Sequence, residues 1–161
     1  MPVFALTVTA SLEACTLAIA DPPTFPIRVL FTCQSCREPA AKHAVLSLSD
    51  AKLEVPGGRG AASYVAKCAA CKAPCSVDVL GVLGAALTPE APAAALARLE
   101  CRGVEPTGWQ AGEGWRVAGL SGGSGAAWEA SFLGEDSFSE YDEGAEAAVE
   151  ASGVTGAWKK E

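Results

Sequence analysis

Apolar and polar side chains alternate from Phe4 to Glu13. The apolar set consists of Phe4, Leu6, Val8, Ala10 and Leu12. A period of two places this set on one face of a β-strand and the residues between them on the other face. The opening segment therefore predicts a strand with one buried and one exposed face.

The same alternation leads into the first pair of cysteines. Leu17 and Ile19 extend the pattern after a bend, and Asp21-Pro22-Pro23 ends it, because prolines lack the N–H donors of a β-ladder. A second strand is predicted over residues 27–33, and its apolar face contains Ile27, Val29, Phe31 and Cys33.

Residues 45–80 carry the pattern of a β-hairpin. Residues 45–55 form a β-compatible run, Pro56-Gly57-Gly58-Arg59-Gly60 is a strong turn sequence, and residues 62–68 alternate again. Residues 77–80 predict a further strand that follows the hairpin.

The rest of the chain mixes helical and extended patterns. Residues 88–98 are rich in alanine, but two prolines interrupt a helix there, and we expect a strand over residues 96–101. Ser139-Glu140-Tyr141-Asp142 resembles a capping box, which predicts a short helix over residues 145–149. Residues 154–159 predict a closing strand.

Two C-x-x-C pairs are the strongest chemical feature of the chain. The predicted ligands are Cys33, Cys36, Cys68 and Cys71. Four thiolates complete the tetrahedral shell of a structural Zn²⁺ site, and a two-residue spacer lets both sulfurs of a pair reach one ion. The spacing between the pairs exceeds that of a usual zinc ribbon, so the hairpin must bring the second pair back to the first.

Other roles for the cysteines remain open at this point. The paired thiols could be buried without binding metal, or one pair could be a redox site, although no βαβ pattern surrounds either pair. Cys75 could replace Cys71 as a ligand, whereas Cys15 and Cys101 are expected in the core. Arg37, Lys67 and Lys72 adjoin ligands and could offset the negative charge of a zinc–thiolate centre.

Weak internal sequence similarities predict two halves with a similar architecture. Phe31-Thr32-Cys33 resembles Leu99-Glu100-Cys101, and residues 57–62 resemble residues 122–127. The 161 residues suit one compact domain. We therefore expect a mostly β, single domain over 1–161 with pseudo-twofold halves at about 1–80 and 81–161, and a zinc-ribbon-like four-cysteine site in the first half only.

The composition narrows the range of partners and compartments. The formal charge is −7, and the twelve basic residues are spread along the sequence, which argues against a nucleic-acid partner. Residues 1–10 show no secretory or membrane-spanning pattern, and seven cysteines, an odd number, fit a reducing cytoplasm.

Three weaker features have plain structural explanations. Residues 57–60 could form an anion-binding nest around Arg59, but a hairpin turn accounts for them. Residues 119–123 match G-x-S-x-G, yet His43 is the single histidine and no strand-to-helix turn is predicted there. The tryptophans (Trp109, Trp115, Trp128 and Trp158) are expected to fill the core of the second half, with a partner-binding surface as the alternative.

Over nearly its whole length the chain resembles the eukaryotic family of CXXC-motif-containing zinc-binding proteins. The resemblance rests on residues 31–36, 57–63, 67–68, 100–106 and 141–143. It implies a pseudo-symmetric β fold, zinc on the four paired cysteines and no established catalytic activity. It also implies a role near cytosolic metal handling, including contact with copper chaperones. Arg37 and Lys72 depart from relatives that often have Gly or Ala after each pair.

We expect a non-enzymatic, cytosolic zinc protein that is a monomer and presents a surface to a protein partner. Nucleic acid and membranes would have no role, and the function could lie in metal homeostasis. The alternative is a transfer protein whose thiolates exchange zinc or copper with a partner, and solvent access to the sulfurs separates the two hypotheses. An enzyme with a pocket that the sequence does not reveal is a third hypothesis.

Overall fold

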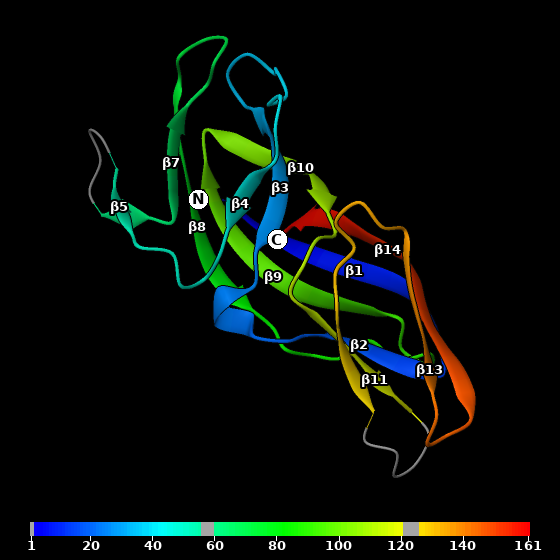
Figure 1. Cartoon of the computed structure of the whole chain (residues 1–161). Coiled ribbons are helices and arrows are strands. Elements are labelled where there is room, and N and C mark those ends of the chain that lie inside the picture. Colours follow the sequence, from blue (N-terminus) through cyan, green and yellow to red (C-terminus); the bar gives the residue numbers. More distant parts are fainter. Residues whose placement is uncertain (1, 56–59, 121–125) are drawn as a thin grey trace.

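The computed structural model describes residues 2–55, 60–120 and 126–161, which form an almost entirely β protein (Figure 1). The first-half elements are β1 (Val3–Glu13), β2 (Cys15–Ile19), the 3₁₀ turn η1 (Pro22–Thr24), β3 (Ile27–Cys33), β4 (Ala44–Leu46), β5 (Leu53–Glu54), β6 (Ala61–Ala62), β7 (Tyr64–Lys67) and β8 (Pro74–Val82). The second-half elements are β9 (Ala93–Arg102), β10 (Val104–Gln110), β11 (Trp115–Gly119), β12 (Ala127–Ala130), β13 (Ser137–Asp142) and β14 (Ala147–Lys160). Within the described ranges, no helix has the length and apolar character needed to cross a bilayer.

A six-stranded antiparallel sheet, in the order β13-β14-β1-β9-β8-β7, packs against two three-stranded sheets. The smaller sheets have the orders β10-β3-β4 and β12-β11-β2, and β5 and β6 form a separate pair. The inward face of β1 buries Phe4, Leu6, Val8 and Ala10, as its alternating pattern predicts. One hydrophobic cluster runs through all three sheets, which confirms a single compact β domain.

Several predicted strands are confirmed. The alternating face of β3 is buried at Ile27, Val29, Phe31 and Cys33, and β2 follows β1 after a bend at Ala14. The alanine-rich segment forms β9 rather than a helix, and it pairs with both β1 and β8. Tertiary pairing at the centre of a sheet therefore overrides the helix propensity of alanine.

The run over residues 45–55 is not one strand. It divides into β4 and β5, because Ser47 donates its backbone N–H and its hydroxyl to the carboxylate of Asp50 and thereby closes a turn. The hairpin between β5 and β6 is present, with Leu53 opposite Ala62. Residues 56–59, which include the candidate anion nest at Arg59, lie outside the described residues.

The predicted helix over residues 145–149 is wrong. Asp142 is 2% exposed, and its Oδ1 accepts the backbone N–H of Ala145 at 3.2 Å, in the turn between β13 and β14. A capping box would place Ser139 at the start of a helix, but Ser139 lies within β13, and the bond that Asp142 makes occurs in turns as well as in helix caps. The predicted closing strand is part of β14.

The G-x-S-x-G match begins at the end of a strand and is followed by another strand. Gly119 ends β11, whose antiparallel neighbour β12 begins at Ala127. Residues 121–125, which lie between these strands in the sequence, are outside the described residues. The described residues on both sides of this segment lie in strands, whereas a nucleophile elbow joins a strand to a helix.

The strand order has an internal twofold relation. β1–β4, β7 and β8 can be exchanged with β9–β14 in chain order. This exchange reproduces the strand orders of the three larger sheets, and β1 and β9, at the centre of the six-stranded sheet, become each other's equivalent. The predicted match of Cys33 with Cys101 is wrong in register, however, and the match of residues 57–62 with residues 122–127 lies largely outside the described residues. Cys33 ends β3, whose equivalent is β11, whereas Cys101 lies in β9, the equivalent of β1.

The tryptophans pack against the core of the second half. Trp115 is 1% exposed and makes edge contacts with Phe25, Trp109 and Phe132. Trp109, Trp128 and Trp158 are partly buried against the same cluster. These contacts support the core-filling role.

Candidate metal centre

The two cysteine pairs occupy matching turns. The backbone N–H of Arg37 donates to Cys33 O, and that of Lys72 donates to Cys68 O, both at 2.9 Å. Cys33 N–H donates to Glu38 O at 3.0 Å, and Cys68 N–H donates to Ala73 O at 2.9 Å. Each turn folds back on its first cysteine, so both thiols of a pair face the same side.

The residue after each pair has a left-handed backbone. Arg37 and Lys72 both have φ 64°. Glycine adopts this conformation without the steric cost that a Cβ brings. Arg37 and Lys72 have a Cβ and therefore adopt this conformation at a steric cost.

The structure brings the four predicted ligand residues together. The Sγ atoms of Cys33 and Cys71 are 3.7 Å apart, and those of Cys36 and Cys68 are 3.6 Å apart. All four sulfurs lie within 4.8 Å of one another. Because Zn–S bonds of about 2.3 Å give a tetrahedron with edges of about 3.8 Å, the cluster has the size of a Zn²⁺ shell.

Backbone N–H groups in both turns favour the thiolate form of the first cysteine. Hydrogen bonds from the N–H groups of Cys71 and Ala70 lower the pKa of Cys68 to about 6. The N–H groups of Cys36 and Ser35 act in the same way and lower the pKa of Cys33. These donors stabilise negative charge on sulfur and would remain as partners of metal-bound thiolates.

The neighbouring sulfurs act against ionisation of Cys36. A hydrogen bond from the backbone of Glu38 lowers its pKa, but burial and the nearby thiols of Cys68, Cys71 and Cys33 outweigh this effect and raise the pKa to about 12. Crowding of like charges therefore opposes four free thiolates at this point. A divalent cation would remove that conflict, which is the donor chemistry of a four-cysteine metal site.

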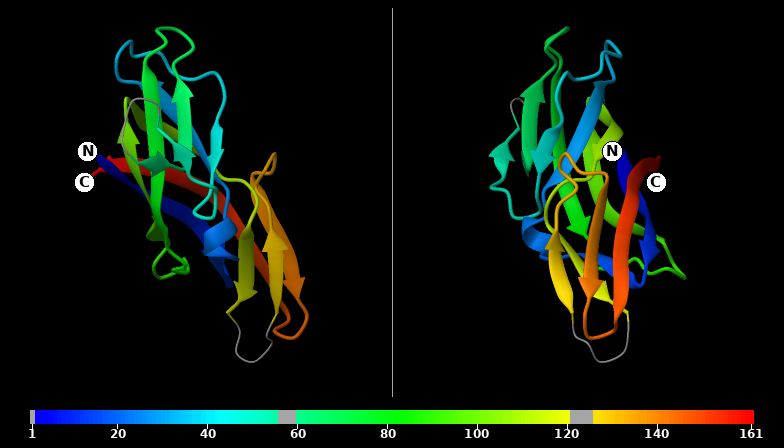
Figure 2. Two further views of the ribbon diagram at one scale, coloured as in Figure 1. Left: turned by 90° about the vertical axis from the view of Figure 1, so that its left-hand side faces the viewer. Right: turned by 45° about the vertical axis from the view of Figure 1, so that its right-hand side comes forward.

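The centre joins two sheets at one end of the molecule. Cys33 ends β3 in a three-stranded sheet, whereas Cys68 follows β7 at the edge of the six-stranded sheet. Figure 2 shows the two loops side by side at the top of both views. Cys33 is buried, Cys36 and Cys68 are half-buried, and Cys71 is exposed. Solvent thus reaches one side of the cluster.

The other cysteines lie outside this group of four. Cys15 and Cys101 are fully buried, in agreement with the expected core positions, and the Cys15 thiol donates to Glu150 O at 3.3 Å. Cys75 is half-buried on β8. The four clustered sulfurs include Cys71 rather than Cys75.

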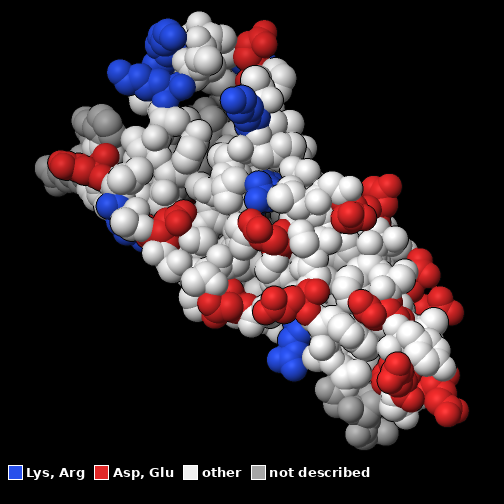
Figure 3. Space-filling model, in the orientation of Figure 1, with Lys and Arg blue, Asp and Glu red and all other residues white. Residues whose placement is uncertain are grey.

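The basic residues beside the centre are all exposed. Arg37 contacts Glu105 at 3.5 Å, and the Lys72 ammonium donates to Ala69 O at 3.3 Å within its own turn. Basic side chains gather at this end of the molecule, whereas acidic side chains dominate the rest of the same face (Figure 3). The basic residues are therefore spread along the sequence but concentrated at one end of the folded molecule.

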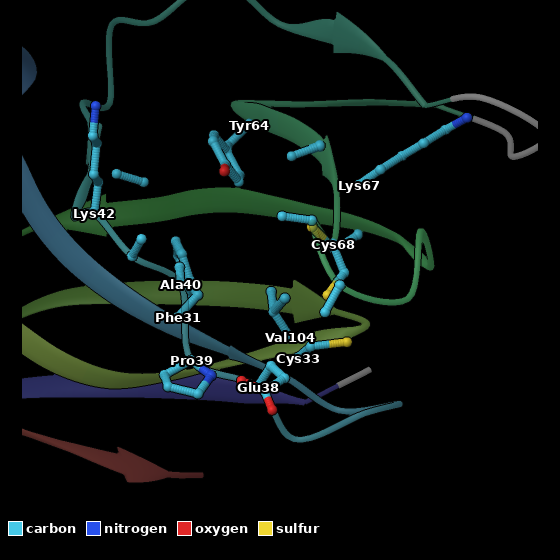
Figure 4. A pocket seen from close by; sticks show the side chains of 16 residues that line it. Phe31, Cys33, Glu38, Pro39, Ala40, Lys42, Tyr64, Lys67, Cys68 and Val104 are labelled. Atoms are coloured by element: carbon cyan, nitrogen blue, oxygen red, sulfur yellow. The ribbon is translucent and has the colours of Figure 1, made fainter.

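A groove of about 460 Å³ borders the cluster (Figure 4). Cys33 and Cys68 lie at one end, and the walls come from residues 38–44 and from β7. Phe31 and Tyr64 stack with ring centroids 5.9 Å apart and form part of its apolar lining. Sequence reasoning missed this groove, because it depends on two edges that are far apart in the chain.

A twisted β domain with a four-cysteine cluster between two sheets defines this chain as a β protein of the zinc-binding class. The family model described as "CXXC motif containing zinc binding protein, eukaryotic" matches residues 5–159, and the chain belongs to this family.

Relatives and solved structures agree with this assignment. The mouse CXXC motif containing zinc binding protein is 33% identical over 76% of each chain, and a UPF0587 protein of Nematostella vectensis is 31% identical over 91% of each chain. The crystal structure of C1orf123 has a TM-score of 0.83 and 29% identity over 99% of each chain. A hypothetical protein from Plasmodium falciparum shares the fold, with a TM-score of 0.76 and 15% identity over both whole chains.

Proposed function

We propose that Cys33, Cys36, Cys68 and Cys71 hold one structural Zn²⁺, and that the protein acts without catalysis by presenting the zinc end to a protein partner in the cytosol. The observation that carries this proposal is the position of the cluster between two sheets. One cysteine pair belongs to each sheet, so a bound ion would join them. Four sulfur ligands would fill the coordination shell and leave no position for a catalytic water.

Single replacements of the ligands test the site. Cys33, Cys36, Cys68 or Cys71 changed to serine should lose stoichiometric zinc, because a complete set of thiolates supplies the binding energy. Serine at Cys15, Cys75 or Cys101 should leave the metal content intact. Metal content by mass spectrometry and thermal unfolding distinguish the groups, and a Cys68→Ser protein with full zinc and wild-type melting would refute the assignment.

The exposure of Cys71 favours a second candidate, in which the thiolates transfer zinc or copper to a partner in metal homeostasis. Incoming thiols could reach this sulfur without unfolding the protein. Zinc loss to a chromophoric chelator separates the two roles. A rate that rises with chelator concentration indicates exchange at the exposed sulfur, whereas a slow rate independent of chelator indicates a structural ion.

The interaction role has its own test. Immobilised protein, with zinc and after zinc removal, is incubated with cytosol, and the retained proteins are identified by mass spectrometry. A partner retained only by the zinc-loaded form supports the proposal. Retention of no protein by the zinc-loaded form contradicts it.

A further inference from the structure

The groove beside the cysteine cluster runs between the end strands of two sheets. β7 is the last strand of the six-stranded sheet, and β4 is the last strand of its three-stranded sheet. The groove is lined by Tyr64 and Ala66 on one side and by Ala40 and Ala44 on the other. The described part of the chain places no strand on the outer edge of β7.

The register of β7 shows which backbone groups are free for a further strand. Cys68 N–H donates to Ala73 O, so these two residues form a hydrogen-bonded pair. In an antiparallel ladder every second pair is of this kind, and the next one along β7 is Ala66 with Cys75. Val65 and Lys67 are in the non-hydrogen-bonded pairs, so their backbone N–H and C=O groups face away from β8. Pro74 lies opposite Lys67, which agrees with a position that needs no N–H donor.

Side chains on the two faces of β7 differ in chemistry. Tyr64 and Ala66 face the apolar groove with Phe31. Lys67 is exposed, and Arg102 lies on the outer face of the sheet, in register with Ser76 and Val65. A strand added at this edge would place every second side chain against the aromatic and alanine lining of the groove, and the others beside Val65 and near the cations Lys67 and Arg102.

The charge of this end favours an acidic occupant. Residues 33–44 and 64–75 carry four of the twelve basic residues of the chain and one of the nineteen acidic residues. The basic ones are Arg37, Lys42, Lys67 and Lys72, and all four are exposed. Even with a zinc–thiolate centre of formal charge −2, this end stays more positive than the rest of the strongly acidic molecule.

We infer that the open edge of β7 binds an extended segment of another protein, in which acidic and apolar residues alternate, by β-strand addition. The inference rests on the proposed interaction role and names the kind of partner. Main-chain hydrogen bonds to Val65 and Lys67 supply affinity, the groove holds the apolar side chains, and the exposed cations select acidic ones.

A short fluorescent peptide in which aspartate and valine alternate is the probe, and fluorescence polarisation with the zinc-loaded protein measures its affinity. Val65→Pro removes one outward N–H and leaves the β7–β8 ladder intact, so binding should weaken about tenfold. Val65→Ala keeps the N–H and is the matched control, for which we expect wild-type affinity. Equal affinity of all three proteins, or no binding to the wild-type protein, would overturn the inference.

Two changes to the peptide test the inference without altering the protein. A lysine–valine peptide should not bind, because it reverses the charge, and an aspartate–valine peptide N-methylated at alternate residues should not bind, because it loses its donors. Weakening of the parent peptide by added salt supports the role of the cations. Binding of the N-methylated peptide with unchanged affinity would refute strand addition.

A failure of strand addition at β7 gives a different experimental result from a failure of the interaction role. If a partner retained by the wild-type protein is retained equally by Val65→Pro, the interaction role stands and the edge of β7 is not its site. If the zinc-loaded protein retains no partner, the interaction role itself fails.

Discussion

At the scale of single residues, the turn after each cysteine pair offers a sharp test of backbone strain. Lys72 has φ 64°, and a left-handed backbone costs a residue with a Cβ roughly 1–2 kcal/mol. We predict that Lys72→Gly is more stable than Lys72→Ala by about 1 kcal/mol. Both variants remove the same charge, so the comparison isolates the backbone.

Urea unfolding of the zinc-loaded variants measures this difference. Arg37→Gly and Arg37→Ala form an independent pair with the same φ. Equal free energies of unfolding within each pair would show that the left-handed backbone carries no strain in these turns.

Cys101 gives a prediction about pH. Burial, followed by the nearby Cys75 and Glu100 groups, raises the pKa of its thiol to about 12 in the folded protein, against about 8.5 for an unfolded chain. Above the lower value the unfolded chain has lost this proton and the folded chain retains it. The free energy of unfolding should therefore fall as pH rises, by up to about 1.4 kcal/mol per pH unit.

Cys101→Ala removes this titration and leaves the other cysteines in place. Unfolding by urea at pH 8, 9 and 10 in reductant should show a steeper decline for the wild-type protein than for the variant. Parallel declines would contradict the effect of burial on Cys101.

The sequence could predict the candidate ligands but not their surroundings. The two-residue spacing of each cysteine pair encodes a local turn, so Cys33 and Cys68 could be assigned from neighbours alone. The stack of Phe31 on Tyr64 and the groove beside it depend on where two sheet edges meet. No local sequence pattern specifies where these two sheet edges lie relative to each other.

At the scale of elements, the turn between β13 and β14 depends on Asp142. Its carboxylate is buried and accepts the N–H of Ala145. We predict that Asp142→Ala lowers the free energy of unfolding by about 1–3 kcal/mol, because a partly buried donor loses its acceptor. Asp142→Asn keeps a carbonyl acceptor and should cost less.

Urea unfolding and hydrogen exchange of the β13–β14 amides measure both effects. An Asp142→Ala protein as stable as Asp142→Asn would show that this bond does not hold the turn.

Alternation predicted strands well, and turn chemistry was the harder part. β1 and β3 follow the period of two over their whole lengths, because each has one face in the core. Ser47 with Asp50, and Asp142 with Ala145, end or connect strands through side-chain bonds that also occur in helix caps. Whether such a bond ends a strand or begins a helix depends on the sheet that surrounds it.

At the scale of the whole molecule, the two halves join their sheets by different means. In the second half, Trp128 on β12 contacts Phe138 on β13, with ring centroids 6.3 Å apart. In the first half, Tyr64 on β7, the equivalent of β13, stacks on Phe31 of β3, and the cysteine cluster lies beside this stack, where Cys33 ends β3 and Cys68 follows β7. The second half thus connects β12 with β13 by aromatic contact, whereas the first half has a four-cysteine cluster beside its aromatic stack.

This difference predicts an unequal response to zinc removal. A strong chelator should loosen β7 and the end of β3, because the binding energy of the ion is lost there, about 10–16 kcal/mol in small zinc modules. The environment of Trp115 should persist, since its ring contacts involve Phe25, Trp109 and Phe132, which lie outside β7 and away from the Cys33 end of β3.

Two probes of the same sample test this prediction. Hydrogen exchange should rise at Tyr64–Lys67 after chelation, while the tryptophan emission stays close to that of the zinc-loaded protein, because all four tryptophans lie in the second half. Restored zinc should restore protection of β7. Simultaneous loss of both signals would mean that the ion stabilises the domain as one cooperative unit and that the aromatic core cannot hold the second half by itself.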